Sequence, residues 1–246
     1  FLMEVKTVGL TKKFGSKTAV DNLNITLANG VYGLLGANGA GKTTTLRCIA
    51  TLLKPTQGEI KVQEFDTVQD GEIVRSKIAF LTNEIKLDPQ FTPKYLFNFF
   101  GELRGMEQEV IESRREELFS YFGINEFKDK KIDELSTGMK QKASIAVSLV
   151  HDPDIVIFDE PTNGLDIITA RAVTDYLRVL KEQGKIVIVS THIMPEAQKL
   201  CDRMAMIIDG KCVFEGTLEK VLEDTGAEDL EDAFFELYKT TMGGEE

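Results

Sequence analysis

The stretch that most constrains the fold is a short apolar run followed by a glycine-rich loop. It reads VYGLLGANGAGKTTT and spans residues 31–45. The spacing of Gly36, Gly41 and Lys42 fits a pattern in which small residues let successive backbone N–H groups turn inward around an anion. The sequence therefore predicts a strand, a phosphate-binding loop and a helix over 43–51, whose N-terminal dipole favours the same phosphates. A glycine turn without a ligand is the alternative interpretation.

A second signal of phosphate chemistry lies in the C-terminal half of the chain. The segment IVIFDE is an apolar run that ends in two carboxylates, Asp159 and Glu160. Asp159 is expected to help hold Mg²⁺, and Glu160 to orient or deprotonate an attacking water. Taken alone, a buried strand followed by an acidic helix cap would explain the same residues. The glycine-rich loop upstream favours the phosphate interpretation.

The pattern of strands and helices predicts an α/β fold. Residues 4–30 alternate apolar and polar side chains around Phe14 and Gly15, which indicates antiparallel strands, and 58–62 is expected to return to that sheet. Between the first two strands of the C-terminal half a helix is expected, with Ala170, Val173, Leu177 and Leu180 at helical spacing and Gly184 at its end. Strands that alternate with helices imply a mostly parallel sheet with ligands at the carboxyl ends of its strands. These later strands are expected at 155–158, 185–190, 204–208 and 212–215.

Between these strand-rich parts, residues 90–150 show helical periodicity. Thr92 is a good N-cap with Pro93 at the first helical position, and Gly123 is expected to end a second helix. We therefore predict a helical subdomain inserted at 84–150. The first helix is expected to turn one apolar face to the core, formed by Leu96, Phe99, Phe100 and Leu103.

The predicted organisation is a single domain over residues 3–246. Its parts are an α/β core with an antiparallel β subdomain (3–83 and 151–216), the helical subdomain, and an acidic helical tail (217–246). From Glu215 onward there are eleven acidic residues and two lysines, so this end of the chain carries −9 of the net charge of −11. The amphipathic helix expected after Leu230 packs either on the body or on another subunit.

Composition narrows the function further. The body outside the tail is close to neutral and has no run of Lys and Arg, which argues against nucleic-acid binding. No apolar run approaches the roughly 20 residues that cross a bilayer, so we expect a soluble chain. Three cysteines without a Cys-x-x-Cys pair indicate reduced thiols in a cytosolic compartment.

The order of five motifs resembles that of the nucleotide-binding subunits of ABC transporters. Besides the glycine-rich loop and IVIFDEPT, the chain has LSTGMKQK at Leu135–Lys142, NGLD at Asn163–Asp166, and STH, which ends at His192. The resemblance covers nearly the whole chain from Met3 and implies a P-loop NTPase core. The STGMKQK variant and the stretch FTPKYLFNFFGELRG look most like the branch with sodium-extrusion and drug-export ATPase subunits.

The resemblance implies a role for each motif. Lys42 would contact the β- and γ-phosphates of ATP, and Thr43 would coordinate Mg²⁺. His192 would sense the γ-phosphate. Phe14 takes the place of the adenine-stacking aromatic, although an aromatic in a β segment is more often a core residue. The loop residues expected to bind the nucleotide are Gly36, Asn38, Gly39, Ala40, Gly41, Lys42, Thr43 and Thr44.

Other motif residues would act across a subunit interface. Ser136 and Gly138 would contact the ATP of a second subunit, since a helix N-terminus is a sound anion site, and Asp166 would cross the interface. One chain then holds half of each active site. ATP would hold a head-to-tail dimer together, and its hydrolysis would release that dimer.

Two positions depart from the family pattern. Where a glutamine that contacts Mg²⁺ is usual, the chain has Asn83 or, with a one-residue shift, Glu84, and the shorter Asn side chain favours a water-mediated contact. The signature has Thr137 and Met139 where Gly and Gln are usual. The phosphate-facing Ser136 remains, so an active cassette is expected.

The expected function is the cytoplasmic ATPase subunit of an ABC exporter, peripheral on the inner face of the cell membrane. It would hydrolyse ATP with Mg²⁺ and drive a separate membrane-spanning permease subunit, whose coupling helix would dock near 83–93. The second ATPase subunit would be a copy or a paralogue. Alternatives are a soluble ABC-type ATPase that acts on nucleic acid or ribosomes, for which coiled-coil insertions or basic surfaces are typical, and a regulatory cassette without turnover.

Overall fold

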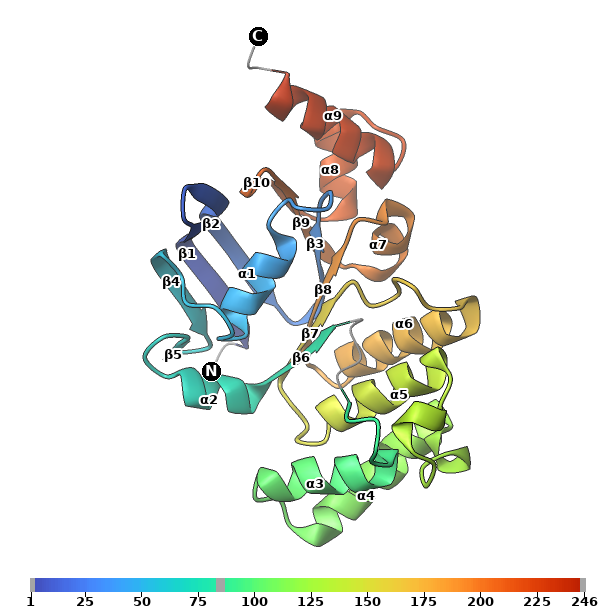
Figure 1. Cartoon of the computed structure of the whole chain (residues 1–246). Helices are drawn as coiled ribbons and strands as arrows, with labels where there is room; N and C mark the ends of the chain where they lie inside the picture. Colours follow the sequence, from blue (N-terminus) through green and yellow to red (C-terminus); the bar gives the residue numbers. More distant parts are fainter. Residues whose placement is uncertain (1–2, 83–86, 244–246) are drawn as a thin grey trace.

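A computed structural model of the chain describes residues 3–82 and 87–243 and has two β-sheets with helices between and around them (Figure 1). The first sheet is antiparallel, with the order β2-β1-β4-β5. Its long strands β1 and β2 meet in a tight hairpin in which Phe14 pairs with Lys17. The predicted N-terminal antiparallel sheet is therefore confirmed. Its strands are β1 (Glu4–Phe14), β2 (Lys17–Ala28), β4 (Gln57–Val62) and β5 (Phe65–Asp66).

The second sheet has six strands in the order β10-β9-β3-β8-β7-β6. All neighbouring pairs from β9 to β6 are parallel, and only β10 runs antiparallel to β9. The central strands β7 and β8 are short and buried at every residue, as their near-continuous apolar sequences require. The strands are β3 (Gly30–Leu35), β6 (Ile78–Thr82), β7 (Ile155–Asp159), β8 (Ile186–Thr191), β9 (Arg203–Ile208) and β10 (Lys211–Gly216).

Helix α1 (Lys42–Ile49) lies between the two sheets (Figure 1). Its buried side chains Leu46, Cys48 and Ile49 join one hydrophobic cluster with residues of both sheets, such as Leu10 of β1 and Ile157 of β7. The glycine-rich loop connects β3 to this helix, so the predicted strand–loop–helix unit is confirmed. The packing holds the loop rigidly at the carboxyl end of the parallel sheet.

The opposite face of the parallel sheet is covered by α6 (Ile167–Glu182) and by the helical segment that the sequence predicts (Figure 1). Thr92 caps the first helix by accepting a hydrogen bond from the N–H of Tyr95, and Gly123 ends the second with a φ of 67°. The segment contains α3 (Pro93–Leu103), α4 (Gln108–Phe122), two 3₁₀ turns, η1 (Ile124–Glu126) and η2 (Ile132–Glu134), and α5 (Thr137–Ser148).

The expected buried face of α3 is partly wrong. Leu96 is buried, but Phe99 and Leu103 are 43% and 68% exposed, and Phe97 is buried instead. The reason is a close helix crossing at Gly101, where an added Cβ would lie 2.7 Å from Cγ1 of Ile111 on α4. Because α4 approaches α3 through this glycine, the face that carries Phe97 and Gly101 turns inward. Phe99 and Leu103 each follow a residue of this face by two positions, about 200° round the helix, and remain at the surface.

The structure also contains elements that the sequence reading passed over: α2 (Gly71–Lys77), strand β6 after it, and α7 (Met194–Leu200). Strand β6 forms the edge of the parallel sheet beside β7. One hydrophobic cluster runs from the helical segment through α6 to this sheet, so the helices share a core with the strands. The division at residues 84 and 150 stays a prediction.

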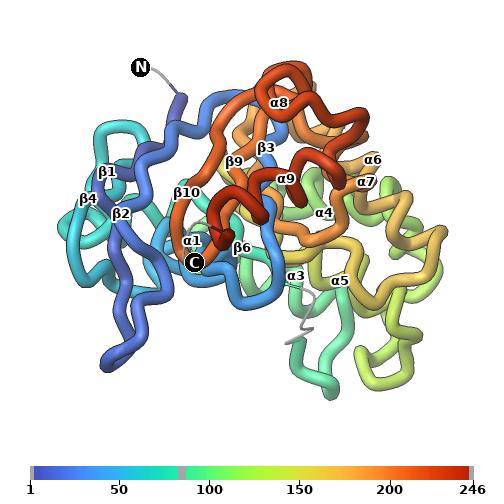
Figure 2. Tube along the Cα trace, turned by 90° about the horizontal axis from the view of Figure 1, so that it is seen from above, coloured from blue at the N-terminus to red at the C-terminus, as the bar shows by residue number. Residues whose placement is uncertain are grey.

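The acidic tail forms α8 (Leu218–Thr225) and α9 (Leu230–Met242), which cross over one end of the parallel sheet (Figure 2). Leu230, Ala233 and Phe234 are buried in a cluster with β9 and α7. Of the two packing modes expected for this helix, the structure has the one on the body. Tyr238 remains exposed.

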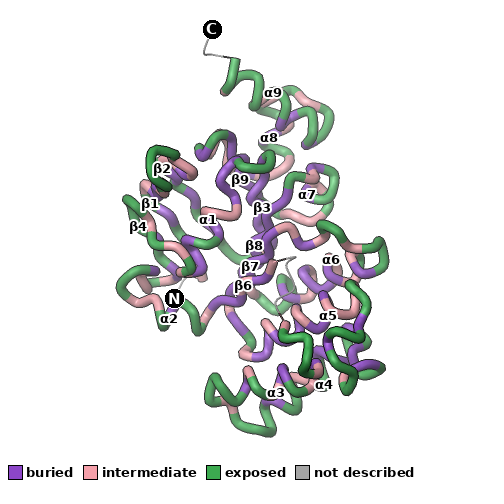
Figure 3. The backbone as a smooth tube through the Cα atoms, in the orientation of Figure 1, coloured by how far each residue is buried: buried purple, intermediate pink, exposed green. Residues whose placement is uncertain are grey.

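Burial concentrates in the central strands, whereas the outer turns of α4 and α9 are largely exposed (Figure 3). Within residues 3–82 and 87–243, no helix is long and apolar enough to cross a bilayer.

Candidate active site

The glycine-rich loop is held close to both sheets, each at one glycine. An added Cβ on Gly36 would lie 2.4 Å from the carbonyl oxygen of Ile207, and one on Gly41 would lie 2.4 Å from that of Ala19. Gly41 also has a φ of 107°, a conformation that L side chains rarely adopt. Both positions therefore require glycine. The loop between them is shaped by backbone contacts, as a cradle for an anion must be.

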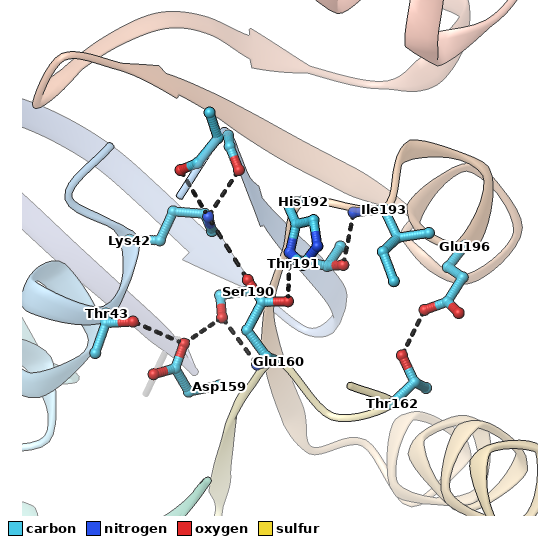
Figure 4. A network of polar contacts seen from close by, with 12 residues as sticks. Lys42, Thr43, Asp159, Glu160, Thr162, Ser190, Thr191, His192, Ile193 and Glu196 are labelled. Carbon is cyan, nitrogen blue, oxygen red and sulfur yellow. Dashed lines mark hydrogen bonds and ion pairs between the residues drawn. The ribbon is translucent and has the colours of Figure 1, made fainter. Parts of the chain in front are cut away.

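Lys42 lies inside this loop with only 5% of its side chain exposed. Its Nζ donates hydrogen bonds to the carbonyl oxygens of Gly36 (2.7 Å) and Ala37 (3.0 Å) and lies 3.6 Å from Oε1 of Glu160 (Figure 4). Burial lowers the pKa of Lys42, and the negative charges of Glu160 and Asp159 oppose that shift. The ammonium group is thus placed at the centre of the loop and paired with a carboxylate.

Thr43 and Asp159 form the second contact of the site. The Thr43 hydroxyl donates to Oδ1 of Asp159 at 3.1 Å, and the Ser190 hydroxyl donates to the same oxygen (Figure 4). Asp159 ends β7 and pairs in register with Ser190 on β8, so neighbouring strand ends bring these groups together. Hydroxyl and carboxylate oxygens are the hard ligands that Mg²⁺ prefers, so this pair fits a magnesium ion beside a phosphate.

Glu160 follows immediately and has an unusual backbone conformation. Its φ is 53°, in the left-handed region that is uncommon for residues other than glycine. The N–H of Glu160 donates to the carbonyl oxygen (3.2 Å) and the hydroxyl (3.0 Å) of Ser190. These bonds turn the Glu160 carboxylate toward the loop. There it contacts Lys42 on one side and Nδ1 of His192 at 3.0 Å on the other (Figure 4).

These residues, Lys42, Thr43, Asp159, Glu160, Ser190 and His192, are called the P-loop cluster below. A pocket of about 340 Å³ opens beside it, within the usual size range of ligand sites. Half-exposed Phe14, at the end of β1, lies in the same pocket wall, where the family resemblance expects it. The pocket is lined by Phe14, Lys17, Ala19, Asn38, Gly39, Gly41, Lys42, Thr43, Thr44 and Glu160. Ala40 is buried and closes a turn with Ala37 inside the loop.

The remaining predicted residues gather elsewhere, at the N-termini of α5 and α6. Ser136 caps α5 by accepting from the N–H of Met139 at 3.3 Å. Asp166 caps α6, and hydrogen bonds from Thr169 lower its pKa. Gly138 joins the two helix ends, because a Cβ there would lie 2.6 Å from the Thr169 hydroxyl. We call Ser136, Gly138, Asp166 and Thr169 the signature cluster.

The structure does not bring the two clusters together within one chain. Among the described residues, no hydrogen bond or ion pair joins a member of the P-loop cluster to a member of the signature cluster. Asn83 and Glu84, the candidates for the residue that contacts Mg²⁺, lie outside the described residues.

Sequence reasoning missed one member of the P-loop cluster. Ser190 bonds both Asp159 and the backbone of Glu160, yet it was not singled out. It is the first residue of the STH motif, at the carboxyl end of the apolar run IVIVS, the strand that lies beside β7, and this place in the motif was the available signal. Only the register between the two strands, which the sequence leaves open, places it opposite Asp159.

Comparison with known proteins gives consistent results. Residues 20–163 match the family model described as ABC transporter. The chain is 42% identical over 214 residues to the ABC transporter ATP-binding protein NatA of Bacillus subtilis (strain 168), which covers 86% of this chain and 87% of NatA. It is 36% identical over 213 residues to the Nod factor export ATP-binding protein I of Burkholderia lata, covering 86% of this chain and 70% of that protein.

A solved structure extends the comparison to the fold. The dimeric structure of the ATP-binding cassette MJ0796, in a post-hydrolysis state bound to ADP and Pi, matches with a TM-score of 0.76 and 30% identity over 87% of this chain and 98% of that chain. The two-sheet architecture and the helical segment therefore have a counterpart in a protein whose bound products are those of ATP hydrolysis. The chain belongs to the ABC transporter family and is one of its ATP-hydrolysing ATP-binding cassettes.

Proposed function

We propose that this cassette is the ATPase subunit of an exporter, that it works with Mg²⁺ as an ATP-driven dimer, and that it powers a separate membrane-spanning permease subunit. The observation that carries the proposal is the separation of the two clusters. The P-loop cluster is assembled within the chain, whereas among the described residues no hydrogen bond or ion pair joins the signature cluster to it. The relative named for Nod factor export supports the direction of transport.

Within one chain, the loop amides and Lys42 would bind the phosphates of ATP. The hydrogen bonds that Lys42 makes to the loop carbonyls hold its ammonium group at the middle of the cradle, where phosphate oxygens would replace the Glu160 contact. Thr43 and Asp159 would hold Mg²⁺. The ion would neutralise negative charge on the phosphate oxygens.

Glu160 is the group placed to act on the attacking water. Its backbone is held by hydrogen bonds from its N–H to Ser190, and its carboxylate lies at the pocket wall in contact with Lys42 and His192. A carboxylate there can orient a water and accept its proton as the water oxygen bonds to the γ-phosphorus, while the bond from that phosphorus to the β–γ bridging oxygen breaks and ADP leaves. His192 contacts the other Glu160 oxygen, so it would position both the carboxylate and the γ-phosphate.

The signature cluster would complete the site of a second chain. Ser136 presents the free N-terminus of α5, a place where backbone N–H groups and the helix dipole favour an anion. Two chains in a head-to-tail arrangement would cover each nucleotide from both sides. The dimeric structure reported for MJ0796 supports this arrangement, since that cassette shares the fold of this chain.

The permease would dock in a groove between the parallel sheet and the helical segment. This groove has a volume of about 630 Å³. Leu52 and Leu53 after α1 lie on one side, and Phe100 of α3 and Arg104 directly after it lie on the other. An amphipathic helix in such a groove is a recurring mode of recognition. The cassette would then be cytoplasmic and peripheral, held at the inner face of the membrane by its partner.

The test is membrane association in cells that express the chain together with its permease. We expect the wild-type chain to sediment with washed membranes. We expect Leu52→Glu to remain in the supernatant with unchanged basal phosphate release, because Leu52 is exposed in the groove. Val68→Glu, at an exposed apolar residue outside the groove, is the matched control. Sedimentation of Leu52→Glu with membranes would contradict the docking site.

The rival functions make different predictions. A cassette acting on nucleic acid would show a salt-dependent mobility shift with DNA or RNA and phosphate release that rises with nucleic acid. A regulatory cassette would bind ATP without releasing phosphate, even in the complex with permease. Either result would replace the exporter proposal.

A further inference from the structure

We propose that Lys12 is a positioning residue for nucleobase binding: it fixes the Phe14 ring and ties it to the helix that carries the phosphate-binding loop. The inference rests on the proposed nucleotide site and adds a residue to it that no motif contains. Lys12 lies two residues before Phe14 on β1. It is not part of the pocket wall, so it would act on the nucleotide only through Phe14.

Two contacts of the Lys12 ammonium group carry the proposal. Its Nζ lies over the Phe14 ring, 5.2 Å from the ring centroid. The same nitrogen donates a hydrogen bond of 2.8 Å to the carbonyl oxygen of Lys54. An ammonium group within about 6 Å of a ring face is held there by the ring quadrupole. Lys12 therefore occupies one face of the ring, and a base has the other face to stack on.

The Lys54 carbonyl connects the ring to α1. Lys54 lies just after that helix, in a turn closed by hydrogen bonds from the N–H groups of Leu52 and Leu53 to the carbonyl oxygen of Arg47. Thr56, two residues after Lys54, donates a hydrogen bond from its N–H to the carbonyl oxygen of Thr11 on β1. Lys12 thus links the Phe14 ring to the segment that follows α1, the helix whose first residue is Lys42. This link would hold the two ends of the nucleotide site in a set relation.

A physical reason follows from the exposure of Phe14. The ring is 49% exposed at a hairpin end, where a free side chain would sample several rotamers. Ordering such a side chain when the ligand binds reduces affinity. Because Lys12 holds the ring beforehand, the base meets a preformed platform. Lys12 should therefore raise the affinity only for ligands that contain a base.

The experiment compares two ligands on the full chain. Isothermal titration would measure the binding of Mg²⁺-ATP and of Mg²⁺-tripolyphosphate, which has the phosphates without the base. We expect Lys12→Met to weaken ATP binding about two- to fivefold, the range of an exposed cation–π contact, and to leave tripolyphosphate binding unchanged. Lys12→Arg keeps the charge and should bind ATP like the wild type. Lys13→Met is the matched control, since Lys13 is exposed and, among the described residues, the cations that lie over an aromatic ring are Lys12 and Lys77.

A double variant tests whether Lys12 acts through the ring. In a Phe14→Ala background, Lys12→Met should have no further effect on ATP binding. The inference is overturned if Lys12→Met binds ATP like the wild type, if it weakens both ligands equally, or if its effect persists without Phe14. A wild-type chain that binds neither ligand would instead overturn the proposed nucleotide site itself, and the inference with it.

Discussion

In the P-loop cluster, polar side chains from different elements contact one another, whereas in the signature cluster each hydrogen bond stays within the first turn of α5 or α6. Lys42 on α1 contacts Glu160 after β7, and Glu160 contacts His192 after β8. Ser136 and Asp166 only cap their own helices. The difference is what we expect if the first cluster is one half of a site and the second acts on the ligand of another chain, as proposed above.

The largest effect is expected at the centre of the P-loop cluster. Lys42→Ala removes the ammonium group that lies between the loop carbonyls and Glu160, and a phosphate would lose its main cation. We expect nucleotide binding or phosphate release to fall at least about a hundredfold. Lys61→Ala, at an exposed lysine on β4, should behave like the wild type in the same assay. Unchanged ATPase activity of Lys42→Ala would show that the site is elsewhere.

A substitution in the signature cluster should separate binding from turnover. Ser136→Asp keeps a good N-cap for α5 but places a negative charge where the γ-phosphate of another chain would lie. We expect turnover to fall at least about tenfold through charge repulsion across the interface, with ATP binding to the monomer unchanged. Ser136→Asn keeps the cap without the charge and should retain more activity. Equal turnover of the Asp and Asn variants would contradict the claim that the signature cluster acts on the phosphate of another chain.

The contact between Thr43 and Asp159 predicts a change in metal requirement. Thr43→Val keeps the shape of the side chain and removes the hydroxyl that donates to Asp159. The Mg²⁺ concentration for half-maximal phosphate release should rise about tenfold. Thr43→Ser should restore the wild-type value. If the Mg²⁺ requirement of the Val variant stayed the same, the two oxygens would not hold the ion.

The smallest effect is expected at the far end of the pocket. Phe14→Ala removes the ring on which a base would stack, and a stacked base contributes roughly 1–3 kcal/mol. Because Phe14 is half exposed, we expect the lower end, about a fivefold loss of ATP affinity. Phe14→Tyr should bind like the wild type. Titration with ATP measures these affinities. If the Ala variant bound ATP as tightly as the wild type, the base would have to stack on another surface.

The sequence predicted the P-loop cluster better than the packing of the helices. Lys42, Thr43, Asp159, Glu160 and His192 could be found because each stands at the end of a strand or start of a helix within a recognisable run. Such positions meet at one edge of a parallel sheet whatever the details of packing.

The missed and wrong predictions lie where a contact between residues far apart in the sequence determines the structure. Ser190 enters the site only through the register of β7 with β8. On α3, the choice between Phe97 and Phe99 as the buried side chain depends on the crossing with α4 at Gly101. Helical spacing fits either face, because aromatic residues lie all round this helix. The local sequence pattern therefore identified most of the candidate site residues, whereas contacts between distant residues determine which side chains turn into the site or the core.

The central claim is that ATP joins two chains through their unlike clusters, and light scattering of Glu160→Gln tests it most directly. This substitution keeps the shape of the side chain and removes the base, so ATP should bind without being hydrolysed. In saturating Mg²⁺-ATP we predict a mass of twice the 27.5 kDa of one chain. Addition of Ser136→Asp to the same chain should return it to a monomer that still binds ATP. A Glu160→Gln chain that binds ATP and remains monomeric would contradict the account.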